Sequence, residues 1–511
     1  MPKVPSNKLY RLIHSLSGPE KRYFKVAAGG QMGKDNKYLL LFDAIEQQPE
    51  FDDEALKLRI YGTAEIQSRK YSELKAYLYE MLLKSLQSYD EKTSVAYRLK
   101  HHLLSVRVLF RRSLFQDCQE QLQKARKLAE KYEQFQALLE ILEWEKQIAY
   151  TRSDIDFLDR ELQRIETEEQ RLQQQLQTIA AYRNTFFRLL VRIRKGPSRN
   201  GEAAGELHKI IDTPLLKEPE LADSHQARIL YYRTLTVFQY AQGNIQLFYE
   251  YSKELIKLME HKPHYLKEDA SEYISAISNL IVACGRLGKY DELKRMLEKL
   301  RKVRPLNQDD ELKIHRQFYQ NKFSLCITTG DFKEGYHALN AHLKEVQQFD
   351  QALFRRSSFY HFYFYISFGA GAYDDALQYL NEWLDLNSTV ERQYLQSAAR
   401  ILNLIVHFEL GNYELLESLI RSTYRFLKKR GQLQEVERLT IAFIRQAVEA
   451  PSKRELREAY ASLKAEFEDL SQQPQTKAFF TQVFDILAWV ESKIEQKPFA
   501  EVIKARFESR I

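Results

Sequence analysis

The stretch GAYDDALQYLNEWL, residues 371–384, joins a glycine to the start of an amphipathic helix. The same arrangement, with a bulky apolar residue two positions after the glycine, recurs at Gly243, Gly288, Gly330, Gly371 and Gly411. These glycines are 45, 42, 41 and 40 residues apart. Because glycine readily ends a helix in the left-handed conformation, each one predicts the turn of a helical hairpin. Hairpins at a nearly constant period predict a repeat array.

The composition favours helices throughout the 511 residues. Glycine (17) and proline (12) are scarce, and no proline occurs between Phe51 and Gly196. Apolar residues make up 44% of the chain, which is ample for a core. We therefore predict an all-α fold, an αα-hairpin superhelix preceded by a small N-terminal helical domain.

Two of the repeats resemble the tetratricopeptide repeat (TPR) in their turn and second helix: LGKYDELKRMLEKL (287–300) and FGAGAYDDALQYLNEWLDL (368–386). Pro305 lies 17 residues after Gly288, the spacing at which that family ends its second helix. The resemblance covers about residues 220–430, with a longer period than the roughly 34 residues of the family. It implies a right-handed, TPR-like solenoid.

The TPR resemblance also implies a binding surface. Asn279 and Asn321 each lie nine residues before a repeat glycine, a slot where the family often places asparagine. By resemblance, both side chains reach a concave groove and bind the backbone of a peptide or protein ligand. The alternative is that they form hydrogen bonds to a neighbouring helix.

Composition and turn signals divide the chain into four segments. These are an N-terminal helical domain (1–95), long helical hairpins (96–200), a flexible loop rich in glycine and proline (201–220), and TPR-like repeats with C-terminal capping helices (221–511). In the first segment, Ser17 and Glu20 form a capping box that starts a helix. The stretch NKLYRLIHSLSGPEKRYFK (7–25) resembles the opening of an uncharacterised bacterial protein family, which implies no activity.

Residues 154–180 follow a heptad pattern. Apolar residues alternate by three and four, and Glu169 is the one polar position of the seam. One interpretation is a long helix that lies along its neighbour in the same chain. The other is a protruding hairpin or a seam between two copies, which would make the chain a homo-oligomer.

The sequence contains no motif of a catalytic, cofactor or metal site. We find no zinc-protease, P-loop, dinucleotide-binding or nucleophile-elbow pattern, so we expect no enzyme activity, no cofactor and no metal. Cys284 and Cys326 each lie four residues before a repeat glycine, which favours a packing role over a redox pair. Together with Cys118 they make an odd, widely spaced set, as expected in a reducing cytoplasm.

One basic cluster stands out against a mild net charge of +7. From residue 181 to 200 there are basic residues and no acid, and the candidates for partner binding are Arg188, Arg192, Arg194 and Lys195. Such a strip can bind phosphates or an acidic partner. The alternative is a solvated helix end whose cations complement the helix dipole.

The leading functional hypothesis is a cytoplasmic, protein- or peptide-binding scaffold with no secretory signal and no membrane-spanning segment. The second hypothesis is a regulator whose first 95 residues bind nucleic acid and whose repeats sense a signal or oligomerise. Its candidate contacts are Lys57, Arg59, Arg69, Lys70 and Lys75. Acidic residues interleave these cations, which favours the scaffold hypothesis.

Overall fold

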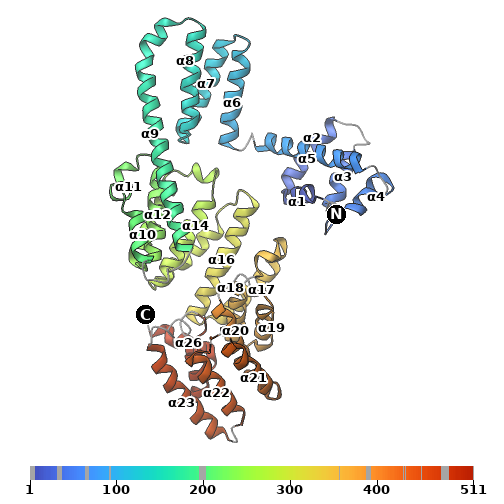
Figure 1. The fold of residues 1–511 in the computed structure, drawn as a ribbon, viewed down its shortest axis with the longest axis vertical. Coiled ribbons are helices and arrows are strands. Elements are labelled where there is room, and N and C mark those ends of the chain that lie inside the picture. Colours follow the sequence, from blue (N-terminus) through green and yellow to red (C-terminus); the bar gives the residue numbers. More distant parts are fainter. Residues whose placement is uncertain are drawn as a thin grey trace. The chain divides into compact units, whose positions relative to one another are not determined.

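The computed structural model describes residues 6–31, 37–63, 68–90, 94–194, 203–355, 357–386, 393–429, 431, 433–449, 452–472 and 483–509. Within these ranges the regular structure is entirely helical, which confirms the predicted all-α array of helical hairpins (Figure 1). None of the described helices has the length and apolar character needed to span a bilayer. The chain forms two compact units: unit 1 is Met1–Ala276 with Arg304–Asp310, and unit 2 is Ile277–Val303 with Glu311–Ile511.

Unit 1 begins with five helices that share one core. They are α1 (Lys8–Ser15), α2 (Gly18–Gln31), α3 (Lys37–Glu46), α4 (Asp53–Tyr61) and α5 (Ser68–Asp90). The predicted capping box is present, because the backbone N–H of Ser17 donates to the Glu20 carboxylate at 2.7 Å. Leu41, Phe42 and Leu78 are fully buried at the centre of this core.

The rest of unit 1 is a row of helical hairpins. Its elements are α6 (Val95–Phe110), α7 (Phe115–Lys131), α8 (Phe135–Thr151), α9 (Ile155–Arg194), α10 (Ala203–Ile211), α11 (Pro214–Lys217), η1 (Pro219–Leu221), α12 (His225–Gln242), α13 (Ile245–His261) and η2 (Tyr265–Lys267). Helix α9 has 40 residues; its first half packs against α8 and its second half against α10 and α12 (Figure 1).

The heptad pattern of α9 is partly explained by packing within the chain. Ile165, Leu172 and Ile179 are buried in the core shared by α6–α9 and α12. Glu169, the polar seam position, pairs with Lys146 of α8 at 2.7 Å. Leu162, near the start of the pattern, remains 42% exposed.

The segment 201–220, expected to be a flexible loop, is largely helical where the structure describes it, so that prediction is corrected. It contains α10, α11 and η1. The reason is burial: Leu207 packs with Leu189 and Phe238 in a small separate core. In addition, the Tyr182 hydroxyl donates to the backbone carbonyl of Leu215 at 2.6 Å.

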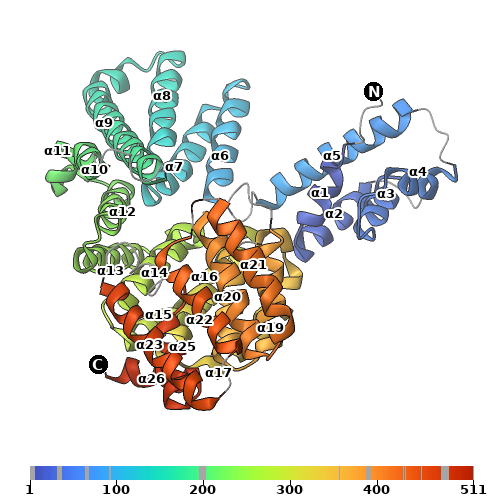
Figure 2. The same cartoon turned by 60° about the horizontal axis from the view of Figure 1, so that its bottom comes forward.

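Unit 2 contains the repeats marked by the last four glycines, drawn from yellow-green to red in Figure 2. Helices α14 (Ser271–Arg286) and α16 (Gln308–Thr329) begin in unit 1 and continue into it. The others are α15 (Tyr290–Arg301), α17 (Phe332–Glu345), η3 (Val346–Gln348), η4 (Gln351–Leu353), α18 (Ser357–Gly369), α19 (Tyr373–Leu384), α20 (Gln393–Glu409), α21 (Tyr413–Lys429), α22 (Glu435–Glu449), α23 (Lys453–Gln472), α25 (Ile486–Glu495) and α26 (Phe499–Glu508).

The five repeat glycines occupy turns, as predicted. All five have positive φ values, from 70° at Gly288 to 79° at Gly330 and Gly371. Around Gly371, the backbone N–H groups of Gly371 and Ala372 donate to the carbonyls of Phe368 and Ser367. This bond pair ends a helix in the Schellman manner and lets the next helix fold back.

The hairpins α6–α9 use the same turn without glycine. Ser113, Glu133 and Ser153 have φ values of 58°, 49° and 55°. At the first of these turns, the backbone N–H groups of Ser113 and Leu114 donate to the carbonyls of Phe110 and Leu109. Non-glycine residues adopt this conformation at a cost of about 1–2 kcal/mol.

The last two helices pack far back along unit 2. In α26, Phe499 lies 5.7 Å from Phe332 and 5.5 Å from Phe368, measured between ring centroids. Phe507 lies 4.8 Å from Tyr290, again between ring centroids. The C-terminal helices thus cover the turn region of α15–α18 with aromatic contacts.

Candidate functional site

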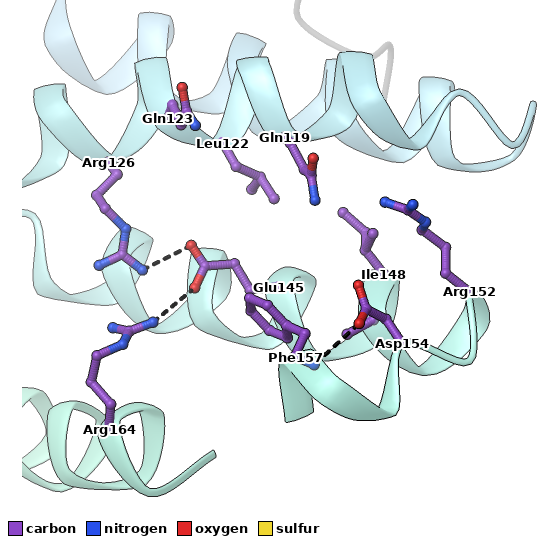
Figure 3. A pocket seen from close by; sticks show the side chains of 11 residues that line it. Gln119, Leu122, Gln123, Arg126, Glu145, Ile148, Arg152, Asp154, Phe157 and Arg164 are labelled. Carbon is purple, nitrogen blue, oxygen red and sulfur yellow. Dashed lines mark hydrogen bonds and ion pairs between the residues drawn. The ribbon is translucent and has the colours of Figure 1, made fainter. Parts of the chain in front are cut away.

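A pocket in unit 1 is the candidate binding site. It lies where α7 faces the end of α8, the α8–α9 turn and the first turns of α9, and its volume is about 290 Å³ (Figure 3). The left-handed residue Ser153 ends α8 and turns the chain into α9, which brings Arg152 and Asp154 to the pocket. The lining residues are Gln119, Leu122, Gln123, Arg126, Glu145, Ile148, Ala149, Arg152, Asp154, Phe157 and Arg164.

An ion-pair network forms one end of the pocket. Glu145 of α8 lies between two arginines: Arg126 of α7 donates to it at 3.0 Å, and Arg164 of α9 lies 3.8 Å away. Both arginines also pair with Glu168 of α9 at 3.0 Å. Figure 3 shows the two guanidinium groups directed at the Glu145 carboxylate. The network therefore links three helices and neutralises Glu145 within the protein.

The charge of Arg164 is reinforced by its neighbours. Its hydrogen bond to Glu161 at 2.6 Å is the main cause that raises the pKa of Arg164, and the charges of Glu145 and Glu168 add to it. Burial acts in the opposite direction. Arg164 is thus a fixed cation whose charge is already matched by carboxylates of the same chain.

The other end of the pocket holds Arg152, whose charge is not matched in this way. Arg152 is exposed, and no ion pair joins it to another residue of the described chain. Figure 3 shows its guanidinium directed toward α7, on the side of Gln119. The nearby Asp154 instead caps α9, because its carboxylate accepts the backbone N–H of Phe157 at 3.1 Å.

The side chains that line the pocket are of kinds that bind ligands through hydrogen bonds, ion pairs and apolar contacts. It provides one available guanidinium, the two side-chain amides of Gln119 and Gln123, and an apolar floor that includes the buried residues Leu122 and Ile148. The lining contains no serine, cysteine, histidine or lysine. Such a site can bind a carboxylate, peptide amides and an apolar side chain together.

The basic residues predicted on α9 lie on the other half of that helix, away from the pocket. Arg188 and Arg194 are exposed to solvent. Arg192 is half-buried and pairs with Glu206 of α10. Lys195 lies outside the described residues.

Asn279 of α14 and Asn321 of α16, predicted to reach a ligand, are both half-buried. The side-chain amide of Asn321 donates to the hydroxyl of Ser278 on α14 at 3.3 Å and to the carbonyl of Gln317 at 2.7 Å. For Asn321 these contacts match the alternative in which the asparagine binds a neighbouring helix.

The cations of the N-terminal helices mostly pair with side chains of the same helical bundle. Asp53 pairs with Lys57 at 3.1 Å and with Lys75 at 2.7 Å. These interactions lower the pKa of Asp53, although burial opposes them as the largest single influence. Arg69 pairs with Glu73 at 2.9 Å, Arg59 donates to the side chain of Gln47, and Lys70 is exposed.

Cys284 and Cys326 lie in the interior, in line with the packing role predicted for them, and so does Cys118. None of Cys118, Cys284 and Cys326 forms a disulfide bond, and all three side chains are buried. Burial raises the pKa of the Cys326 thiol to about 12, so it is not a reactive thiolate near neutral pH. In the described part of the chain, no group of three or more histidine, cysteine or acidic side chains is placed to hold a metal ion.

Comparisons of the chain with family models, with curated proteins and with solved structures found no match. The helical-repeat architecture therefore rests on the hairpin geometry alone.

The pocket is not predictable from local sequence patterns. Arg126, Glu145 and Arg164 lie on three helices and are far apart in the chain. Only the side-by-side packing of α7, α8 and α9 brings them together. The available signal was the triplet Arg152, Ser153 and Asp154, a polar turn between two strongly helical stretches.

Proposed function

We propose that the chain is a non-enzymatic protein-binding scaffold whose α7–α9 pocket holds an extended peptide segment of a partner. The observation that carries this proposal is the position of Arg152. Its guanidinium borders a pocket whose two other arginines, Arg126 and Arg164, are already paired with carboxylates. A ligand carboxylate therefore has one available cation to bind, beside an apolar floor.

The remaining lining residues specify the kind of segment. Gln119 and Gln123 lie one helical turn apart on α7, and each amide offers a donor and an acceptor to a peptide backbone. Leu122, Ile148 and Phe157 offer an apolar surface. The preferred segment carries an aspartate or glutamate beside an apolar residue.

The repeated hairpins support a place among TPR-like solenoids, because the glycine turns recur with one backbone geometry. Such arrays bind segments by many small contacts. The three buried cysteines, none of which forms a disulfide bond, agree with a reducing, cytoplasmic setting.

The alternative, a regulator that binds nucleic acid through residues 1–95, has weaker support. Lys57, Lys75 and Arg69 are each paired with a carboxylate, and nucleic-acid binding would have to displace these pairs. The full-length chain should accordingly show no salt-dependent binding to a random DNA duplex. Binding that weakens steeply with added salt would revive the alternative.

A random peptide array probed with the full-length chain tests the scaffold proposal. Bound peptides should be enriched in an acidic residue next to an apolar one. Arg152→Gln should lower their affinity about 10-fold or more, because a hydrogen bond to a charged group contributes about 1.5–3 kcal/mol. The matched control is Arg160→Gln, an exposed arginine of α9 that does not line the pocket. Equal binding by both variants, or no enrichment, would refute the proposal.

A further inference from the structure

Helix α6 carries a second surface, distinct from the pocket. From residue 94 to 116 the sequence contains no aspartate or glutamate. Its cations are Arg98, Lys100, Arg107, Arg111 and Arg112, with His101 and His102 beside them. This is a strongly one-sided charge for a helix at the start of the hairpin row.

One face of α6 is fully used by packing. Its buried side chains meet α7 and α8, and they are Val95, Leu99, Leu103 and Val106. The helix is also held at its start, because the backbone N–H of Val95 donates to the Glu268 carboxylate at 2.8 Å. The carboxylate lies at the positive end of the helix dipole, a favourable position. Helix α6 is thus a rigid element of unit 1.

The opposite face of α6 also carries apolar side chains, with one histidine among them. Tyr97, His101, Leu104 and Val108 follow one another at steps of four, three and four residues, and they share one side of the helix. Tyr97 is 37% exposed, Leu104 61% and Val108 50%. Lys100 and Arg107, seven residues apart and both exposed, follow one edge of this stripe. A face that only meets water does not need three large apolar side chains at this spacing.

We propose that this face of α6 binds an acidic amphipathic helix of a partner protein. The alternation of four and three residues is the spacing by which two helices pack along a seam. The flanking cations select glutamate and aspartate at the edges of the partner helix. A second copy of the same face is disfavoured, because cations would then face cations across the seam. The inference does not depend on the pocket, since no α6 residue lines it.

The test uses the full-length chain and two synthetic four-heptad peptides with leucine at both seam positions. One peptide carries glutamate at the flanking positions and the other carries lysine. The glutamate peptide should bind at least about 10-fold more tightly than the lysine peptide, and added salt should narrow the difference. Equal binding of the two peptides would overturn the inference.

Two sets of variants locate the contact. Leu104→Glu with Val108→Glu should abolish binding of the glutamate peptide, whereas Val26→Glu, at an exposed apolar residue of α2, should not. Lys100→Glu with Arg107→Glu keeps the apolar stripe and should reverse the preference toward the lysine peptide. Circular dichroism confirms that each variant is folded. Arg152→Gln should leave this binding unchanged, which separates the inference from the proposed pocket.

A bilayer surface is the competing ligand, since anionic lipid headgroups share the charge of the glutamate peptide. Vesicles of phosphatidylserine and phosphatidylcholine provide the comparison. If the chain binds the vesicles through Leu104 and Val108 and ignores the glutamate peptide, the face is a lipid-binding surface and the inference is wrong.

Discussion

The hairpins α16–α19 and α6–α9 differ in where they place their large apolar side chains. The first set buries them, whereas the second leaves several exposed to solvent. In α18, the aromatic run from Phe359 to Phe368 is directed largely into the core, and Phe364 is fully buried. In α6 and α9, apolar side chains such as Leu104 and Phe187 remain on the solvent side. Aromatic content alone therefore does not indicate a binding surface. What hairpin packing leaves exposed is the better guide.

Polar side chains also differ between the two regions, in whether the protein itself satisfies them. His342 of unit 2 is fully buried, yet both ring nitrogens are satisfied: Nδ1 lies 2.9 Å from Nε2 of His315, and Nε2 lies 2.5 Å from the hydroxyl of Tyr363. Arg152 of unit 1 is exposed and has no ion pair within the described chain. A satisfied polar group stabilises the fold, whereas an available one in a pocket is open to a ligand.

Substitution of a repeat glycine can test how tightly unit 2 is packed around its turns. A methyl group at Gly330 would lie 2.7 Å from the backbone nitrogen of Lys504 in α26, at a φ of +79°. Gly330→Ala should lower the free energy of unfolding by about 3 kcal/mol, from backbone strain together with overpacking. Gly371→Ala has the same φ and open space, so it should cost about 1 kcal/mol. Urea unfolding measures both, and equal losses would contradict the packing argument.

The glycine turns show which part of the fold the sequence can predict. The left-handed conformation favours glycine at the turn. Gly243, Gly288 and their equivalents therefore predict each turn from the local sequence. The turns at Glu133 and Ser153 have the same backbone without that signal. The packing of α26 against the turn at Gly330 could not be predicted either, because it depends on contacts between segments that are distant in the chain.

The apolar seam of α9 packs either against helices of the same chain or against a second copy, and two leucine substitutions distinguish these cases. Leu172 is fully buried against neighbouring helices, so Leu172→Ala should lower the free energy of unfolding by about 3 kcal/mol. Leu162 is 42% exposed, and Leu162→Ala should cost less than about 1 kcal/mol. Analytical ultracentrifugation should give the same mass for both variants and the parent chain. A loss of mass in Leu162→Ala would instead indicate a seam between copies.

The seam also shows why the candidate site escaped prediction. A heptad pattern identifies a long helix but not its partner, and here the partners are α8, α10 and α12. Once α8 is known to pack against both α7 and α9, Glu145 falls between Arg126 and Arg164. The amphipathic pattern of α10 was obscured by the glycines of its surrounding sequence. Local patterns were therefore sufficient for turns and helices, and insufficient for sites built by packing.

Acidification should weaken unit 2 through its buried histidines. Burial lowers the pKa of His342 from the ordinary 6.5 to about 3. Between these values the unfolded chain binds a proton that the folded chain does not, so stability falls as the pH drops below about 6.5. At pH 5 the loss from His342 should be about 2 kcal/mol.

Urea unfolding between pH 7 and pH 5 measures this loss. His342→Gln should lower the free energy of unfolding at pH 7, because His315 and Tyr363 lose a hydrogen-bond partner. It should also reduce the further loss of unfolding free energy between pH 7 and pH 5. His337→Gln, at an exposed position of the same helix, should leave the pH dependence unchanged. An unaltered slope in His342→Gln would show that other groups cause the acid sensitivity.

The turns of unit 1 that lack glycine should respond only weakly to substitution. Ser113 is exposed and has a φ of 58°, a conformation that strains any residue with a β-carbon. Ser113→Gly removes that strain but makes the unfolded chain more flexible, so the net gain should be only about 0.5 kcal/mol. Thermal unfolding should show a slightly higher midpoint. A decrease would mean that the Ser113 side chain stabilises the turn. The hairpins α6–α9 would then differ from those of unit 2 in how their turns are stabilised, as well as in which side chains their helices expose.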